Sequence, residues 1–162
     1  MRRGWLIANA LWLQAGWWLC VLGARWPWLL LVVPPVMVAH VFLCRDRAGE
    51  SRALLRVTLA GCLLDSLLGA LGVFAFDSRP LPMWLAMLWL VLASGLRHSL
   101  AWAGRPFWRG ALFGALGGPL AYLAGARLAQ VDLPLGTVTT ALLLAPIWAL
   151  LLPSLVRLAT WR

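Results

Sequence analysis

Apolar residues in this chain fall into six long runs, which are separated by short segments rich in arginine, glycine and proline. The runs cover residues 5–22, 28–44, 54–76, 83–102, 110–128 and 135–156. Each is close to the roughly 20 residues that an α-helix needs to cross a hydrocarbon core of about 30 Å. The pattern predicts an all-α fold: a polytopic integral membrane bundle of about six transmembrane helices, forming a single domain over residues 1–162.

The composition excludes a water-soluble domain. Hydrophobic residues make up 63% of the chain and charged residues 12%, whereas soluble domains average about 45–50% and about 25%. The longest polar segment, residues 45–52, is too short to be a soluble domain. Any functional site is therefore expected within the bilayer or at its edge. The chain is also rich in tryptophan, with 12 residues, many of them at the ends of the runs, where indole rings favour the membrane interface.

The positive charge predicts the orientation of the bundle. The net charge is +9, and all 14 basic residues are arginines that lie mostly between the apolar runs. Six spans place ten of them on the side of the termini: Arg2, Arg3, Arg45, Arg47, Arg52, Arg56, Arg105, Arg109, Arg157 and Arg162. The opposite side has three, Arg25, Arg79 and Arg127. By the positive-inside rule both termini are cytoplasmic. This distribution indicates a membrane orientation signal and not a nucleic-acid-binding surface.

A few polar residues interrupt the apolar runs, and such residues inside a span are functional candidates because they are costly there. The predicted intramembrane polar cluster consists of Asn9, Gln14, His40, Asp65, Arg97, His98, Ser99 and Tyr122. Most of them fall at mid-depth or towards the cytoplasm. Two interpretations remain open. The cluster is either a structural network that joins the helices, or a polar cavity open to the cytoplasm that takes a headgroup, an ion or a proton.

Asp65 is the carboxylate expected farthest from either interface. It comes nine residues after Arg56, and Arg97 comes eight residues before Arg105. With a rise of about 1.5 Å per helical residue, Asp65 and Arg97 should lie at similar depth on neighbouring antiparallel helices. We therefore predict that Asp65 faces the interior and bonds to Arg97, to His98 or to both.

No metal site or cofactor is predicted. His40, His98 and Asp65 lack the paired spacing on one helix that a zinc site favours. The three cysteines, Cys20, Cys44 and Cys62, contain no C-x-x-C pair, and we expect them to pack as small apolar residues.

Small residues mark the fifth run as a packing helix. Gly110, Gly114 and Gly118 recur every four residues, and Gly117 and Gly125 belong to a second small face. Faces of this kind let two helices approach closely. The pattern favours packing within the bundle, with homo-oligomerisation as the alternative.

Several short motifs together resemble a known family. They are Asn9, Gln14, Gly16 and Trp17 in the first run, Asp65-Ser66 in the third, His98-Ser99-Leu100 and Trp102 in the fourth, and the segment 117–125, GGPLAYLAG, in the fifth. Over essentially the whole chain, the sequence resembles the bacterial inner-membrane proteins of domain-of-unknown-function family 2878. The resemblance implies a small multi-pass protein of a Gram-negative inner membrane and no particular reaction. Through the gene neighbourhoods of relatives it also implies an association with lipid modification.

These observations favour an accessory or binding component in membrane-lipid or envelope processes over a complete enzyme. The expected partners are membrane lipids, with a second copy or another membrane protein as further partners. One alternative is a small transporter or flippase with a polar cavity around Asp65, Arg97 and His98. Another is a membrane-embedded lipid-modifying enzyme that uses Asp65 and His98 as acid and base.

Overall fold

The computed structural model describes residues 3–161, so Arg2 and Arg162, which contribute to the arginine count, lie outside it. The all-α prediction is confirmed. The described residues form six α-helices and two short 3-10 helices: α1 (Arg3–Gly23), η1 (Pro27–Val32), α2 (Val33–Leu43), α3 (Arg47–Ala70), α4 (Met83–Leu96), η2 (Ala101–Gly104), α5 (Phe107–Ala129) and α6 (Thr137–Thr160).

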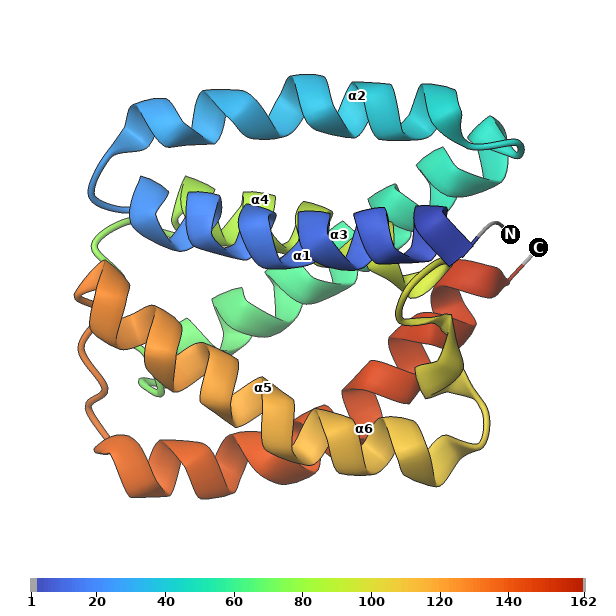
Figure 1. The fold of residues 1–162 in the computed structure, drawn as a ribbon. Helices are drawn as coiled ribbons and strands as arrows, with labels where there is room; N and C mark the ends of the chain where they lie inside the picture. The colour runs from blue at the N-terminus through green and yellow to red at the C-terminus, as the bar shows by residue number, and fades with distance from the viewer. Residues whose placement is uncertain (1–2, 162) are drawn as a thin grey trace.

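Successive helical segments run in alternating directions (Figure 1). As a result α1 begins and α6 ends at the same end of the molecule, which we call the terminal end. The α2–α3 and α4–α5 connections also lie at this end, and the other three connections lie at the opposite end. Because η1 leads directly into α2, residues 27–43 form one continuous helical segment that corresponds to the second apolar run.

The third helix begins earlier and ends earlier than the apolar run at residues 54–76. It starts at Arg47 because the Asp46 side chain caps it, accepting a hydrogen bond of 2.9 Å from the Gly49 backbone N–H. It ends at Ala70, and the chain then turns so that Val73 and Phe74 are buried among the helices. The early start brings residues 47–53, expected in a polar loop, into the helix.

The fourth helix also differs from its predicted range of 83–102. It ends at Leu96, and residues 97–100 form a turn that leads into η2. The turn is closed by hydrogen bonds of 2.9 Å from the backbone N–H groups of His98 and Leu100 to the Gly95 carbonyl oxygen. Arg97 and His98 therefore lie in the turn and not within the helix.

Helices α5 and α6 pack through the glycine face. A Cβ atom at Gly114 would overlap the Trp148 carbonyl oxygen, and one at Gly118 would overlap the Trp148 ring. Gly110 is in similarly close contact with η2, at the Ala103 carbonyl oxygen. The close approach of α5 to α6 at Gly114 and Gly118 is the contact that the four-residue spacing of small residues predicts. Gly117 and Gly125 face away from α6 and have more open surroundings.

In the described part of the chain, four helices are long and apolar enough to cross a membrane: α1, α3, α5 and α6. The segments 27–43 and 83–96 are apolar but shorter. Large hydrophobic side chains cover the outer surface, including Leu63 and Leu120, which are 66% and 68% exposed. A surface of this kind is unusual for a protein in water.

Candidate functional site

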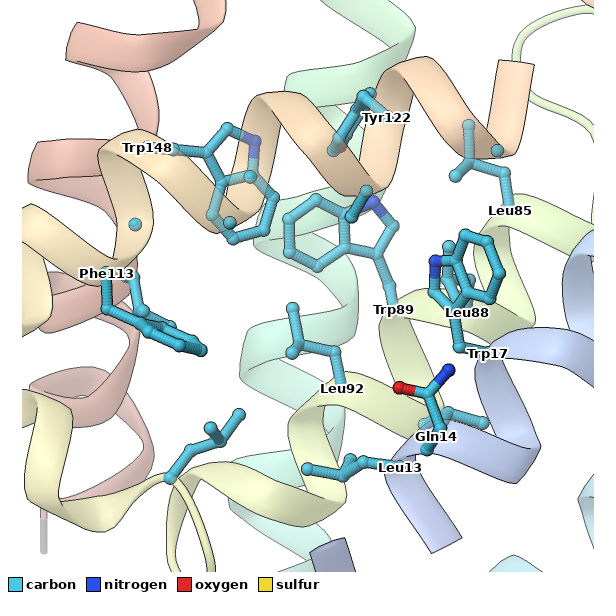
Figure 2. Close-up of a pocket in the computed structure, with 18 of the residues that line it drawn as sticks. Leu13, Gln14, Trp17, Leu85, Leu88, Trp89, Leu92, Phe113, Tyr122 and Trp148 are labelled. Carbon is cyan, nitrogen blue, oxygen red and sulfur yellow. The ribbon is translucent and has the colours of Figure 1, made fainter. Parts of the chain in front are cut away.

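A cavity of about 540 Å³ lies between α1, α4, α5 and α6 (Figure 2). Its wall is mostly aliphatic and aromatic, and it includes Leu13, Trp17, Leu85, Leu88, Trp89, Leu92, Phe113 and Trp148. The volume lies within the range of about 300–1,000 Å³ that is typical of small-molecule sites. The lining favours an apolar ligand.

The cavity opens between α1 and α5. Gln14 on α1 and Phe113 and Ala121 on α5 line the cavity and are also exposed at the outer surface. Gly117 keeps this side open, because a Cβ atom there would meet only the Phe113 ring, at 3.8 Å. The opening therefore lies on the apolar flank of the bundle and is bordered by the Gln14 amide.

Asp65 supports one wall of this cavity from behind. It is 0% exposed, and its two carboxylate oxygens accept hydrogen bonds from the Trp89 indole N–H, at 2.6 Å, and from the Tyr122 hydroxyl, at 2.7 Å. Both donors line the cavity. The Trp89 ring also stacks on Trp148, with ring centroids 5.8 Å apart. Asp65 thus fixes aromatic side chains of α4 and α5 from a position on α3.

The prediction that Asp65 bonds to Arg97 or His98 is wrong. Arg97 instead forms ion pairs of 2.9 Å with Asp46 and 3.2 Å with Glu50. Helix α4 ends at Leu96 and does not extend through Arg97, so Arg97 does not lie at the expected position on a helix beside Asp65. Glu50, expected in the polar segment 45–52, lies in the first turn of α3, where it pairs with Arg97. The predicted polar residues therefore do not form one cluster, and the first group, Asp65 and Tyr122, lies behind the cavity wall.

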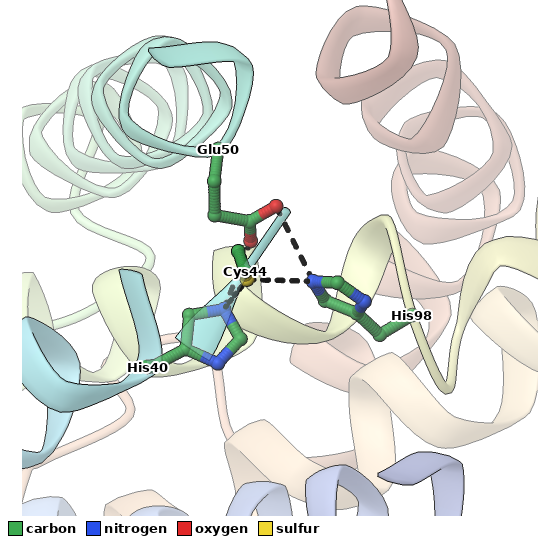
Figure 3. Close-up of side chains that lie close together, drawn as sticks. All are labelled: His40, Cys44, Glu50 and His98. Carbon is green, nitrogen blue, oxygen red and sulfur yellow. Dashed lines mark hydrogen bonds and ion pairs between the residues drawn. The ribbon is translucent and has the colours of Figure 1, made fainter. Parts of the chain in front are cut away.

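The second group is a cluster at the terminal end of the bundle, formed by His40, Cys44, Glu50 and His98 (Figure 3). The Glu50 carboxylate lies 2.9 Å from Nε2 of His40 and 3.3 Å from Nε2 of His98. The Cys44 Sγ lies 3.8 Å and 3.6 Å from the same two nitrogens. One sulfur, two imidazole nitrogens and a carboxylate from three segments thus converge, and these are atoms that bind transition metals.

The cluster is shielded from water, and Glu50 is 1% exposed. Arg97 balances the Glu50 charge and is itself held by Asp46. The hydrogen bond from Arg97 lowers the pKa of Asp46 below its ordinary value. Burial, with a smaller contribution from the Glu50 carboxylate, raises the pKa of the Cys44 thiol to about 11. At neutral pH Cys44 is therefore a thiol in this arrangement, and a poor nucleophile.

Trp5 of α1 covers the two histidines. Its ring stacks on His40 and meets His98 edge-on, with centroid distances of 5.8 Å in both cases. Its indole N–H donates a hydrogen bond of 3.3 Å to Nδ1 of His98. When neutral, His98 must then carry its proton on Nε2, which points towards Glu50.

Asn9 joins α1 to the end of α4. Its amide donates to the Ser94 carbonyl oxygen at 3.0 Å, and its own carbonyl accepts from the Ser99 hydroxyl at 2.6 Å and from the Ser99 backbone N–H at 3.2 Å. Asn9 and Ser99 therefore have a structural role in this arrangement, and Ser99 also contributes to the cavity lining.

Sequence reasoning missed Glu50 and gave Cys44 and Trp5 only packing or interfacial roles. One signal was available, because His40 and Cys44 are four residues apart and so lie near one another at the end of α2. The third donor, Glu50, follows six residues after Cys44, beyond a turn whose geometry the sequence alone does not define.

Comparisons with known proteins give a family but no activity. Neither a curated protein nor a solved structure matches the chain. The model of the family described as "Protein of unknown function (DUF2878)" matches residues 6–154, nearly the whole sequence, and the chain therefore belongs to this family.

Proposed function

We propose that this protein resides in the bacterial inner membrane, with six spans and both termini in the cytoplasm. In this proposal it binds a membrane lipid and acts as an accessory or binding component, not as a catalyst. The observation that carries the proposal is the cavity of about 540 Å³ between α1, α4, α5 and α6, whose wall is aliphatic and aromatic. An acyl chain fits the chemistry of that wall.

The position of the opening supports a ligand that comes from the bilayer. The opening lies between α1 and α5, two of the helices long and apolar enough to cross a membrane. The neighbouring surface is apolar, as shown by Leu11 and Leu116, which are 66% and 61% exposed. A lipid chain could enter sideways from the hydrocarbon core, while the Gln14 amide at the opening offers hydrogen bonds to the polar part of the molecule.

The arrangement of polar groups favours binding over catalysis and over transport. Tyr122 and Ser99 line the cavity, but their hydroxyl groups already bond to Asp65 and Asn9. Within residues 3–161, no member of the His40–Cys44–Glu50–His98 cluster lines the cavity. An acid–base pair of Asp65 and His98 is not assembled either, because the two residues bond to different partners. The polar groups thus form supports for the cavity rather than a polar path through it.

Native mass spectrometry of the detergent-solubilised protein tests this proposal. We expect the wild-type chain to retain one phospholipid after delipidation has removed annular lipid. Gly117→Phe places a ring in the cavity, because a Cβ at Gly117 has open space around it, and it should lose most of the retained lipid. Leu116→Phe adds the same ring on the outer surface and should retain lipid as the wild type does. Equal retention by all three proteins would contradict the proposal.

A further inference from the structure

The His40–Cys44–Glu50–His98 cluster has a role that the lipid-binding cavity does not explain. We propose that these four side chains form a structural Zn²⁺ site at the terminal end of the bundle. The donor atoms are Nε2 of each histidine, Sγ of Cys44 and a carboxylate oxygen of Glu50, and all lie within 4.8 Å of one another. Imidazole, thiolate and carboxylate are the three ligand types that bind zinc in proteins.

The distances between the donor atoms are close to those of tetrahedral coordination. Zinc bonds of about 2.0–2.3 Å place neighbouring ligand atoms of a tetrahedron roughly 3.3–3.6 Å apart. The sulfur lies 3.6 Å and 3.8 Å from the two imidazole nitrogens. The Glu50 oxygens lie 2.9 Å and 3.3 Å from the same nitrogens. Side-chain rotations that bring the donor atoms, which already lie within 4.8 Å of one another, to this spacing would place all four around one ion.

The donor set selects the class of ion. Ca²⁺ and Mg²⁺ prefer all-oxygen sites, whereas a mixed nitrogen, sulfur and oxygen site suits Zn²⁺. The ligands are nearly dry, since His40 is 6% and Cys44 is 9% exposed. Four protein ligands leave no open position for substrate, which is the arrangement of a structural site and not of a catalytic one.

Neighbouring residues complete the site. One Glu50 oxygen approaches His40, and the other accepts a hydrogen bond of 3.2 Å from Arg97, so that one oxygen can bind metal while the other keeps its arginine. Support of this kind orients the ligands of many metal sites. Binding displaces the Cys44 thiol proton to solvent. Because Nε2 of each histidine binds the ion, the ring protons of His40 and His98 move from Nε2 to Nδ1. The Trp5 hydrogen bond to Nδ1 is then lost.

The ion would join three segments of the chain at this end. His40 and Cys44 come from the end of α2, Glu50 from the first turn of α3, and His98 from the turn after α4. Because the Asn9 hydrogen bonds link α1 to the same turn, the ion would stabilise the end of the bundle at which four helical segments meet.

Metal binding by the purified full-length protein tests this proposal. After treatment with a chelator, the protein is mixed with Zn²⁺, desalted and assayed for metal by mass spectrometry, and a second sample is mixed with Co²⁺. We expect one Zn²⁺ per chain and, with Co²⁺, a visible absorption spectrum of tetrahedral type with a thiolate-to-cobalt charge-transfer band. Cys44→Ala should lose that band and the stoichiometric Zn²⁺. Cys62→Ala, which changes a cysteine outside the cluster, should keep both.

Circular dichroism and size-exclusion chromatography establish that each variant is folded. If Cys44→Ala is not folded, the Co²⁺ spectrum of the wild-type protein decides alone, because the charge-transfer band requires a cysteine ligand. The proposal is overturned if the wild type binds no stoichiometric Zn²⁺, if its Co²⁺ form has no thiolate band, or if folded Cys44→Ala binds Zn²⁺ as well as the wild type does.

Discussion

The Trp89 indole N–H donates a hydrogen bond of 2.6 Å to Asp65, which joins α4 to α3 directly behind the cavity wall. The other Asp65 oxygen accepts from Tyr122 of α5 at 2.7 Å. One buried carboxylate therefore orients two aromatic side chains that line the cavity. Its position within an apolar run makes Asp65 a candidate for a functional role, and in the fold Asp65 supports the wall of the cavity.

Substitution of Asp65 should reveal this supporting role. Asp65→Leu removes both acceptors and leaves two buried donors unpaired, at a cost of about 1–3 kcal/mol for each group. Asp65→Asn should cost less, since its carbonyl still accepts from Trp89 and its NH₂ group can donate to the Tyr122 oxygen. Chemical denaturation in detergent measures both values. A lower stability of Asp65→Asn than of Asp65→Leu would contradict this prediction. It would mean that Asp65 stabilises the fold through an ionised carboxylate and not through its two hydrogen-bond acceptors.

The glycine face of α5 should be intolerant of larger side chains. Gly118→Leu forces a side chain into the Trp148 ring of α6, and overpacking of this kind costs about 1–3 kcal/mol or more. Gly117→Leu is the matched control, because its side chain enters open space. Thermal unfolding compares the two. Equal stability of both variants would mean that α5 and α6 are not in close contact at Gly118.

Glu50 should be among the most sensitive positions of the terminal end. Among residues 3–161, Glu50→Ala removes the only carboxylate paired with His40 and one of the two acidic partners of Arg97. Loss of one member of a buried ion pair costs about 3–5 kcal/mol. Ser51→Ala, at the exposed neighbouring position, should have little effect. A small loss in the Glu50 variant would show that the cluster is hydrated rather than buried.

The arginine distribution predicts the orientation of the protein in a membrane. Since α1 begins and α6 ends at the same end of the bundle (Figure 1), reporters fused to either terminus should give the same result. We expect activity from a cytoplasmic reporter and none from a periplasmic one, because the predicted six spans put ten of the arginines on the side of the termini. A periplasmic signal from one terminus alone would require an odd number of spans.

The sequence predicted the helices well because long runs of apolar residues are typical of helices that lie in a membrane or pack in a bundle. It also predicted that Gly114 and Gly118 contact a neighbouring helix, because small residues four positions apart form a pattern that is visible within one segment of sequence. The partners of Asp65 could not be predicted in this way. They depend on where α4 ends, and that end is set by the turn at residues 97–100 and not by hydrophobicity.

The cluster at the terminal end could not be predicted from the sequence either. Glu50 follows an arginine-rich segment and resembles a solvated loop residue by composition. The Asp46 cap starts α3 early enough to place Glu50 in its first turn, where it faces two histidines from elsewhere in the chain. Contacts between residues such as Glu50 and His98 arise from tertiary packing, and a local pattern in a single sequence does not predict them.

Photocrosslinking in lipid vesicles tests lipid binding most directly. The protein is reconstituted with a phospholipid that carries a diazirine on one acyl chain, and adducts are located by peptide mass spectrometry. Trp89 and Leu152 line the cavity but are only 2% and 3% exposed, whereas Leu120 is 68% exposed on the outer surface. A lipid in the cavity predicts adducts at Trp89 or Leu152 that fall several-fold in Gly117→Phe, while adducts at Leu120 are unchanged. Adducts confined to Leu120 and other outer positions in both proteins would contradict it.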